Sequence, residues 1–162
     1  MAIRTGTIQT HYQIFDKFEE LSAEDQLLME KAKGILNVSY SPYSKFKVGS
    51  ALILDNGLML TGTNMENASY PLCICAERVA LYHAGAQYPE AKIISMAVTA
   101  KSSKLALPRP VSPCGACRQV ITEFESKQQA PIRLILMGDS GEVFIFESGK
   151  NLLPLAFDGS IV

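Results

Sequence analysis

Hydrophobic residues recur along the chain with two spacings, one typical of helices and one typical of strands. The helical patterns cover residues 23–38, 76–84 and 115–124. The strand-like apolar runs cover residues 47–54, 58–64, 93–99, 132–137 and 143–146. Because helices and strands alternate in this order, we expect the α/β class, with a three-layer α/β/α sandwich built around a mixed sheet of about five strands.

Local signals sharpen several boundaries. Ser22 stands at the N-cap position of the first helical pattern. Asp55-Asn56-Gly57, between two strand-like runs, predicts a tight hairpin turn. Gly85 is placed to end the second helix. Residues 152–157 predict a short closing helix.

The two parts of the chain differ in pattern. Residues 1–20 mix β-branched, polar and aromatic residues without a long period, and we expect them to form an extra edge strand or an arm. Residues 21–162 carry all the regular patterns. We expect them to form a single domain, because a chain of 162 residues is long enough to bury one core.

Composition and charge exclude some classes of protein. Hydrophobic residues make up 48% of the chain and charged residues 19%, which is typical of a globular protein. The net charge of −1 gives no basic surface of the kind that nucleic-acid binding requires. No apolar run approaches the ~20 residues of a membrane helix. The N-terminus lacks a basic-then-apolar signal segment, so we expect a cytoplasmic protein without a nucleic-acid or membrane partner.

The four cysteines favour a metal site over disulfides. They occur as Cys73-x-Cys75 and Cys114-x-x-Cys117, and each pair is followed by a helical pattern. Without an export signal, this spacing indicates metal ligation. Both motifs fall where a loop becomes a helix, and the unpaired N–H groups and the dipole there favour thiolate over thiol.

Three of these cysteines predict a reactive metal centre. Cys114 and Cys117 share a face of the first helical turn, and Cys75 comes from the other helix start. A metal with three protein ligands keeps a fourth position for water, and Glu77, two residues from Cys75, is placed to move the protons of that water. Arg78 is the first candidate for a cation that offsets the thiolate charge, and Arg118 is the second.

A purely structural zinc site is the alternative, and it would need a fourth protein ligand. Cys73 is the nearest candidate, but its strand-like direction relative to Cys75 turns it away, so we expect a buried thiol there. His83 lies about two helical turns beyond Cys75, and His11 is in the unassigned N-terminal stretch. We expect both histidines to be ordinary surface or packing residues.

The metal motif matches the signature of the zinc nucleobase deaminases, in which a ligand, any residue and Glu are followed by Pro-Cys-x-x-Cys. Over roughly residues 35–157 the chain resembles a narrower family, the small homotetrameric cytidine deaminases. The resemblance is carried by five blocks in the order of that family. These blocks span residues 41–49, 64–70, 75–78, 112–119 and 152–157.

The resemblance implies a function and roles for individual residues. Residues 21–162 would form a cytidine deaminase-like catalytic domain that hydrolyses cytidine and 2′-deoxycytidine to uridine and 2′-deoxyuridine with release of ammonia. Cys75, Cys114 and Cys117 would bind one Zn²⁺ per subunit, Glu77 would be the proton shuttle and Arg78 would contact the ligand thiolates. The substrate-binding positions would be Phe46, Asn64, Glu66, Ala76 and Phe157.

In this assignment Asn64 and Glu66 would hydrogen-bond the ribose hydroxyls, and Phe46 would pack on the pyrimidine. Phe157 would reach a neighbouring subunit, so a homotetramer would share its active sites. Within enzymes the alternative is a related zinc deaminase of another aminated base or nucleoside, such as blasticidin S. Phe46 as plain core, and Asn64 and Glu66 as parts of a turn, are the structural alternatives.

Overall fold

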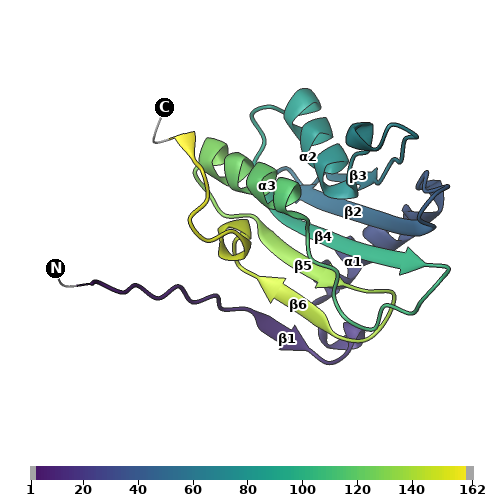
Figure 1. The fold of residues 1–162 in the computed structure, drawn as a ribbon, viewed down its shortest axis with the longest axis horizontal. Helices are drawn as coiled ribbons and strands as arrows, with labels where there is room; N and C mark the ends of the chain where they lie inside the picture. The colour runs from purple at the N-terminus through teal and green to yellow at the C-terminus, as the bar shows by residue number, and fades with distance from the viewer. Residues whose placement is uncertain (1–2, 160–162) are drawn as a thin grey trace.

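A six-stranded mixed sheet runs through the middle of the protein, as the computed structural model shows for residues 3–159 (Figure 1). The strand order is β1-β6-β5-β4-β2-β3. Only β4 and β5 are parallel, and every other neighbouring pair is antiparallel. The strands are β1 (Gln13–Phe15), β2 (Phe46–Leu54), β3 (Met59–Thr63), β4 (Ile93–Ser102), β5 (Arg133–Met137) and β6 (Val143–Phe146).

Helices cover both faces of this sheet. Helix α1 (Ala23–Gly34) packs on β2 and β4 from one side. Helices α2 (Ala76–Gln87) and α3 (Gly115–Gln128) lie side by side on the other (Figure 1). Four short 3₁₀ helices complete the described part of the chain: η1 (Phe18–Glu20), η2 (Leu36–Val38), η3 (Tyr70–Leu72) and η4 (Gly149–Leu152). The predicted α/β/α sandwich is confirmed, with six strands where about five were expected.

Two apolar cores separate the three layers because strand side chains alternate in direction. Leu52 and Met96 point into the core under α2 and α3, together with Leu81 of α2 and Ile121 of α3. Their neighbours Ala51 and Ala97 point into the second core, which α1 covers. The central strands are therefore apolar on both faces, which explains their continuous hydrophobic runs.

Some helix boundaries predicted from the sequence are confirmed by the structure, and others are wrong. Ser22 caps α1 as predicted, because its side chain accepts a hydrogen bond from the N–H of Asp25. Helix α2 continues through Gly85 to Gln87, so the prediction that Gly85 ends it is wrong. A Cβ on Gly85 would lie 3.0 Å from the ring of Phe124, so this glycine makes room for α3 instead.

The closing helix predicted over residues 152–157 is also wrong. The structure has only the single turn η4, which ends at Leu152. Downstream, Pro154 cannot donate a backbone hydrogen bond, and Leu155 takes a positive φ of 54°. The segment therefore leaves the helical conformation and continues as an irregular chain.

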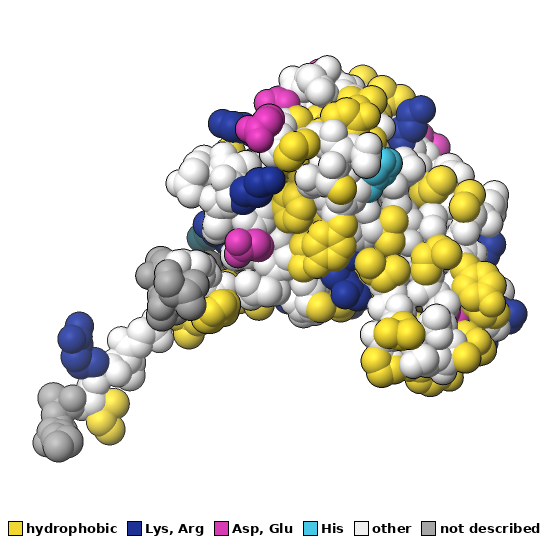
Figure 2. All heavy atoms as spheres, turned by 90° about the horizontal axis from the view of Figure 1, so that it is seen from above, with side chains coloured by type: hydrophobic (Ala, Val, Ile, Leu, Met, Phe, Trp, Pro, Cys, Tyr) yellow, Lys and Arg dark blue, Asp and Glu magenta, His cyan; other side chains and the backbone are white. Residues whose placement is uncertain are grey.

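The N-terminal stretch contributes the extra strand. Gln13–Phe15 pairs with β6 as an edge strand, and the ring of Tyr12 stacks on Phe146 and lies tilted against Phe144. Thr10 donates to the carbonyl of Asn151 at 2.9 Å, and residues 3–9 before it form an arm that stands clear of the body (Figures 1 and 2). Residues 1 and 2 of the predicted extension lie outside the described part. Among the described helices, none has the length and apolar character to cross a membrane.

We predict that Gly49→Ala destabilises the fold. A Cβ at Gly49 in β2 would lie 2.1 Å from the carbonyl oxygen of Ala32 in α1, so helix and sheet must separate. Overpacking of this kind costs about 1–3 kcal/mol of unfolding free energy. Gly34→Ala at the exposed end of α1 is the matched control, because a Cβ there meets nothing within 4 Å. Urea unfolding that ranks the two variants equally would contradict the prediction.

Candidate metal centre and its cavity

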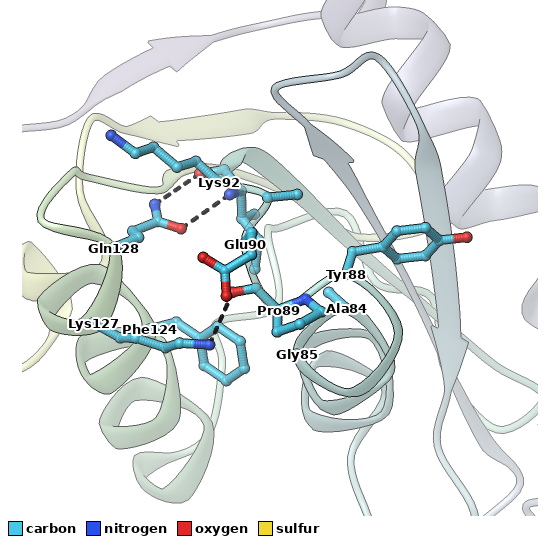
Figure 3. A pocket seen from close by; sticks show the side chains of 11 residues that line it. Ala84, Gly85, Tyr88, Pro89, Glu90, Lys92, Phe124, Lys127 and Gln128 are labelled. Carbon is cyan, nitrogen blue, oxygen red and sulfur yellow. Dashed lines mark hydrogen bonds between the residues drawn. The ribbon is translucent and has the colours of Figure 1, made fainter.

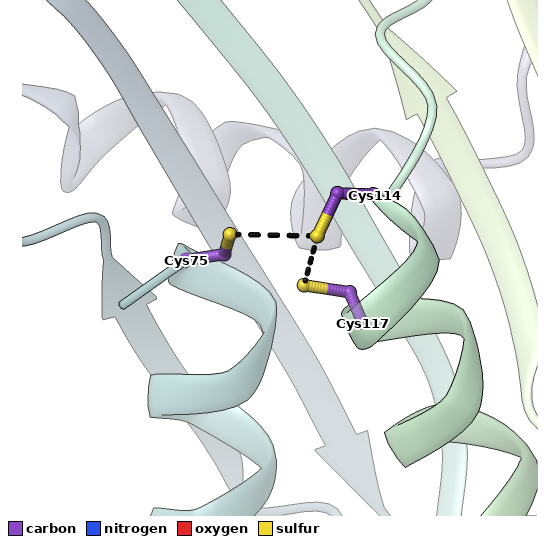
Figure 4. Close-up of side chains that lie close together, drawn as sticks. All are labelled: Cys75, Cys114 and Cys117. Atoms are coloured by element: carbon purple, nitrogen blue, oxygen red, sulfur yellow. Dashed lines mark hydrogen bonds between the residues drawn. The ribbon is translucent and has the colours of Figure 1, made fainter. Parts of the chain in front are cut away.

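Two helix starts bring three thiols together. Cys75 is the N-cap residue of α2 and Cys114 is the N-cap residue of α3, while Cys117 lies on the first turn of α3. Neither N-cap side chain caps its own helix, so both sulfurs are free to face the gap between the helices. Figure 4 shows the three sulfurs pointing toward one another. The positive ends of two helix dipoles converge on them.

The spacing of the sulfurs fits a zinc ion. Cys75 Sγ lies 3.7 Å from Cys114 Sγ, which lies 3.5 Å from Cys117 Sγ, and all three atoms are within 4.8 Å of one another. Tetrahedral zinc with Zn–S bonds of ~2.3 Å places its sulfurs about 3.8 Å apart. The donor set is three soft thiolates, which zinc favours. These residues can therefore hold one zinc ion.

Of the two interacting thiols of Cys75 and Cys117, that of Cys75 loses its proton more readily. A hydrogen bond from Cys117 holds the pKa of the Cys75 thiol down, at about 5, with further help from Arg78 and Cys114 and against the effect of burial. The same bond to Cys75, together with burial, raises the pKa of Cys117. The hydrogen bond between the two sulfurs therefore favours a thiolate at Cys75 and a thiol at Cys117, and a metal ion bound to both would displace the proton of Cys117.

Arg78 supplies the cation next to this centre. Its Nη2 donates to Cys75 Sγ at 3.7 Å, and this bond raises the pKa of the guanidinium. Arg118, the second candidate, does not reach the sulfurs. It donates through Nε to the carbonyl of Pro113 and through Nη1 to the carbonyl of Leu152, so it ties the C-terminal segment to the start of α3.

Glu77 lies in the same cavity as the sulfurs, on the first turn of α2. Its side chain is buried, with 4% of its surface exposed. Burial raises the pKa of its carboxyl and the charge of Cys75 adds to this rise, while hydrogen bonds from its own backbone and from Cys117 oppose it. A buried carboxyl with a raised pKa, beside a metal centre and at a cavity wall, is typical of a proton-transfer group.

The cavity next to the sulfurs has a volume of about 530 Å³, within the range of small-molecule sites. The cavity lining is mainly apolar, with a few polar and charged side chains. Arg78 is the one cationic side chain of the lining. The lining residues are Ser44, Phe46, Val48, Asn64, Met65, Glu66, Cys73, Ile74, Cys75, Glu77, Arg78, Val98, Val111, Ser112 and Cys114.

Most hydrogen-bonding groups of the Asn64 side chain are already bonded to other residues of the chain. Its Oδ1 accepts from the N–H of Val48 at 2.8 Å and from the hydroxyl of Ser39 at 2.6 Å, and its Nδ2 donates to the carbonyl of Phe46 at 2.9 Å. One amide N–H remains for a ligand. The side chain also fixes the start of β2, and with it the position of Phe46.

Glu66 keeps more capacity for a ligand. Its Oε2 accepts from the N–H groups of Tyr43 at 2.8 Å and Ser44 at 3.3 Å. Hydrogen bonds from Ser44 and these backbone groups hold the pKa of Glu66 low. An ionised carboxylate accepts about four hydrogen bonds, so acceptor sites remain.

Other predicted positions lie outside the lining or differ from expectation. The side chain of Ala76 is fully buried, so only its backbone is available to a ligand. Phe157 is 63% exposed and lies away from the cavity of its own chain. Cys73 is half-buried rather than buried, and it accepts from the N–H of Asn67 instead of joining the other sulfurs. His11 and His83 are exposed, as predicted.

The sequence patterns did not predict the residues that form the apolar wall of the cavity next to the sulfurs. Val48 and Val98 lie on neighbouring strands, and Val111 precedes Cys114 in a loop. The alternation along β2 and β4 carries a signal for the first two, but it does not say which face holds the cavity. No periodic signal points to Val111.

A second hollow lies between the C-terminal ends of α2 and α3 (Figure 3). Lys127 Nζ donates to the carbonyl of Pro89 across it, and the amide of Gln128 bonds both backbone groups of Ile93. Its lining contains none of the three clustered thiols. These contacts join the two helix ends to β4. We therefore assign the residues around this hollow a structural role.

Comparison with known proteins agrees with the geometry. The family model described as the cytidine and deoxycytidylate deaminase zinc-binding region matches residues 22–130. A cytidine deaminase of Halalkalibacterium halodurans is 41% identical over 134 residues, which cover 82% of this chain and 92% of that relative. A cytidine deaminase of Sporosarcina psychrophila is 39% identical and covers 86% of this chain and 90% of its own.

A solved structure is similar over the same part of the chain. The crystal structure of cytidine deaminase from Burkholderia pseudomallei superposes with a TM-score of 0.70 at 38% identity. The match covers 85% of this chain and 100% of that one. Sequence and fold therefore point to the same group of proteins.

We predict that Cys114→Ala loses zinc and stability together, because two sulfurs cannot replace the three-thiolate set. Metal analysis should show less than a tenth of the zinc of the unchanged protein, and thermal unfolding should begin at a lower temperature. Cys73→Ala is the matched control: it also removes one thiol from the cavity wall, but it should keep full zinc. Full zinc in Cys114→Ala would show that the ligand set is wrong.

Proposed function

The chain belongs to the cytidine and deoxycytidylate deaminase family, and on this premise we propose that it hydrolyses cytidine and 2′-deoxycytidine to uridine and 2′-deoxyuridine. Water supplies the oxygen that replaces the amino group on C4, and ammonia leaves. The observation that carries the proposal is the meeting of three thiols at the edge of a cavity that is also lined by one buried carboxyl, Glu77. This is the minimum that a hydrolytic deamination needs.

Cys75, Cys114 and Cys117 would hold one zinc ion, which when bound would lower the pKa of water toward neutrality. Glu77 accepts a proton from the attacking water and passes it to N3 of the pyrimidine, which makes C4 electrophilic. The water oxygen adds to C4. Glu77 then delivers the second proton to the amino group, and the C4–N bond breaks.

The raised pKa of Glu77 supports this role. A carboxyl that both takes and gives protons works best when its pKa lies near the working pH, and burial moves the pKa of Glu77 in that direction. The N-terminal position in α2 fixes the carboxyl two residues from Cys75, so proton transfer needs no large movement.

The cavity walls favour a free nucleoside as substrate. Phe46 and Val98 offer apolar surface to a pyrimidine, and Glu66 has acceptor sites left for ribose hydroxyls. Arg78, the one cation of the lining, donates to Cys75, so the cavity has no positive side chain available to bind a substrate phosphate. Orienting contacts of this kind lower the barrier by positioning the ring.

We also propose a homotetramer with shared active sites, in which residues 21–162 form the catalytic domain and residues 1–20 are an extension. Large apolar side chains are exposed near the cavity mouth, among them Tyr43, Met65 and Tyr70. Figure 2 shows apolar side chains gathered on the face that carries α2 and α3. Burial between subunits would account for them. Three thiols kept reduced for a metal suit the cytoplasm.

We predict that Glu77→Gln keeps zinc and fold but loses at least about a thousandfold in turnover, because the amide cannot carry protons between water and the ring. Release of ammonia from cytidine, with zinc content measured on the same sample, checks this. Normal turnover in this variant would remove Glu77 from the mechanism.

The same assay with other substrates tests the function itself. Cytidine and deoxycytidine should be deaminated, and a strong chelator should abolish the activity. CMP and blasticidin S are the comparison substrates, and a preference for either would replace the proposed substrate class.

We predict that Phe157→Ala raises the KM for cytidine about tenfold, because the ring would close a neighbour's site. Leu155→Ala is the control, since Leu155 is also exposed, at 93%, and two residues away. Coexpression of Phe157→Ala with Glu77→Gln should restore activity in mixed oligomers, where an intact Glu77 meets an intact Phe157. No restoration would place Phe157 outside the neighbouring site.

A further inference from the structure

A second ligand-sized cavity, of about 550 Å³, lies beside η2, at the start of β2 and the end of β4. Its lining includes three lysines, Lys45, Lys47 and Lys101, together with four serines. No acidic residue lines it. The whole chain carries 15 basic and 16 acidic residues, so this cavity concentrates positive charge that the rest of the sequence does not have in excess.

The strand register forces two of these cations together. Lys47 of β2 is the direct partner of Lys101 in antiparallel β4, so both side chains stand on the same face of the sheet. Like charges directly opposite each other in an antiparallel pair destabilise it. An anion bound between them would remove this cost.

None of the three lysines is neutralised within the part of the chain that the structure describes. The ion pairs among residues 3–159 involve only Lys33 and Arg133 as cations. The charge of Lys45 reaches Glu66, where it contributes weakly to lowering the pKa of that carboxyl. Lys47 and Lys101 have no acidic partner among residues 3–159.

This lysine cavity is separate from the catalytic one, although the two share a strand. Along β2 and the residue before it, Phe46 and Val48 line the catalytic cavity while Lys45 and Lys47 line the lysine cavity. The alternation of a strand sends the two sets to opposite faces. The two linings have no residue in common.

We propose that the lysine cavity binds a small molecule bearing a phosphate group. Ammonium groups and serine hydroxyls are donors that suit phosphate oxygens, and the volume is too large for a free ion alone. Tyr40 and Pro42 supply an apolar wall against which the rest of such a molecule can lie. This site goes beyond the proposed deaminase activity and does not depend on it.

Calorimetric titration of the zinc-loaded protein with inorganic phosphate and with UMP tests the proposal. UMP has no amino group at C4, so it cannot be deaminated. Lys47→Gln and Lys101→Gln should each bind UMP about tenfold more weakly than the unchanged protein, through loss of one charged hydrogen bond. Lys31→Gln, an exposed lysine of α1 outside the lining, is the matched control and should bind as the unchanged protein does.

Two outcomes overturn the proposal: absence of binding to the unchanged protein at physiological salt, or equal binding by Lys47→Gln and Lys31→Gln. Binding of inorganic phosphate as tight as that of UMP shows that the phosphate alone is recognised, and tighter binding of UMP shows that the apolar wall takes part.

Thermal unfolding gives a readout independent of ligand identity. Without phosphate, Lys101→Gln should unfold at the same temperature as the unchanged protein or higher, because it removes the repulsion. With phosphate the unchanged protein should gain more. The same titration of Glu77→Gln should give unchanged UMP affinity, so failure of the catalytic proposal and failure of this one are distinguishable.

Discussion

The convergence of two helix starts on one point is the constraint on which the site depends. Cys75 begins α2 and Cys114 begins α3, and the sulfurs meet only if the two helices are held side by side on the same face of the sheet. Gly62 in β3 makes this possible, because a Cβ there would lie 2.5 Å from the carbonyl oxygen of Ala76. Close contact between helix and sheet therefore sets the metal geometry.

Two buried glutamates differ in their hydrogen bonds, and therefore in what each side chain can do. Glu125 is 3% exposed and accepts from the N–H groups of Ile132 and Gly149, both at 2.7 Å, and from the hydroxyl of Ser148. It is saturated, and it locks α3 to the C-terminal segment. Glu77 is buried to the same degree but accepts few hydrogen bonds and faces a cavity. Burial at a cavity wall, with a raised pKa, is what suits Glu77 to proton transfer.

The sequence predicts those features that local chemistry decides. The cap at Ser22 and the helix starts at Cys75 and Cys114 follow from short-range spacing, while the grouping of the three thiols follows from the motif signature. It leaves open whether residues 1–20 form an edge strand or an arm, because β1 depends on the edge of β6 that its three residues pair with. The prediction that Gly85 ends α2 failed for a similar reason, because the Phe124 ring that needs the space beside Gly85 lies on another helix, α3.

Charge balance explains why an arginine follows the buried carboxyl of Glu77. Three thiolates on a divalent ion leave a net charge of −1, which would weaken the effect of the ion on water. Arg78 donates to Cys75 at 3.7 Å, so the local sum returns to zero. Its Nε is buried without a hydrogen-bond partner in the described part of the chain, a cost that the attraction of the sulfurs offsets. The guanidinium thus belongs to the metal centre as much as the sulfurs do.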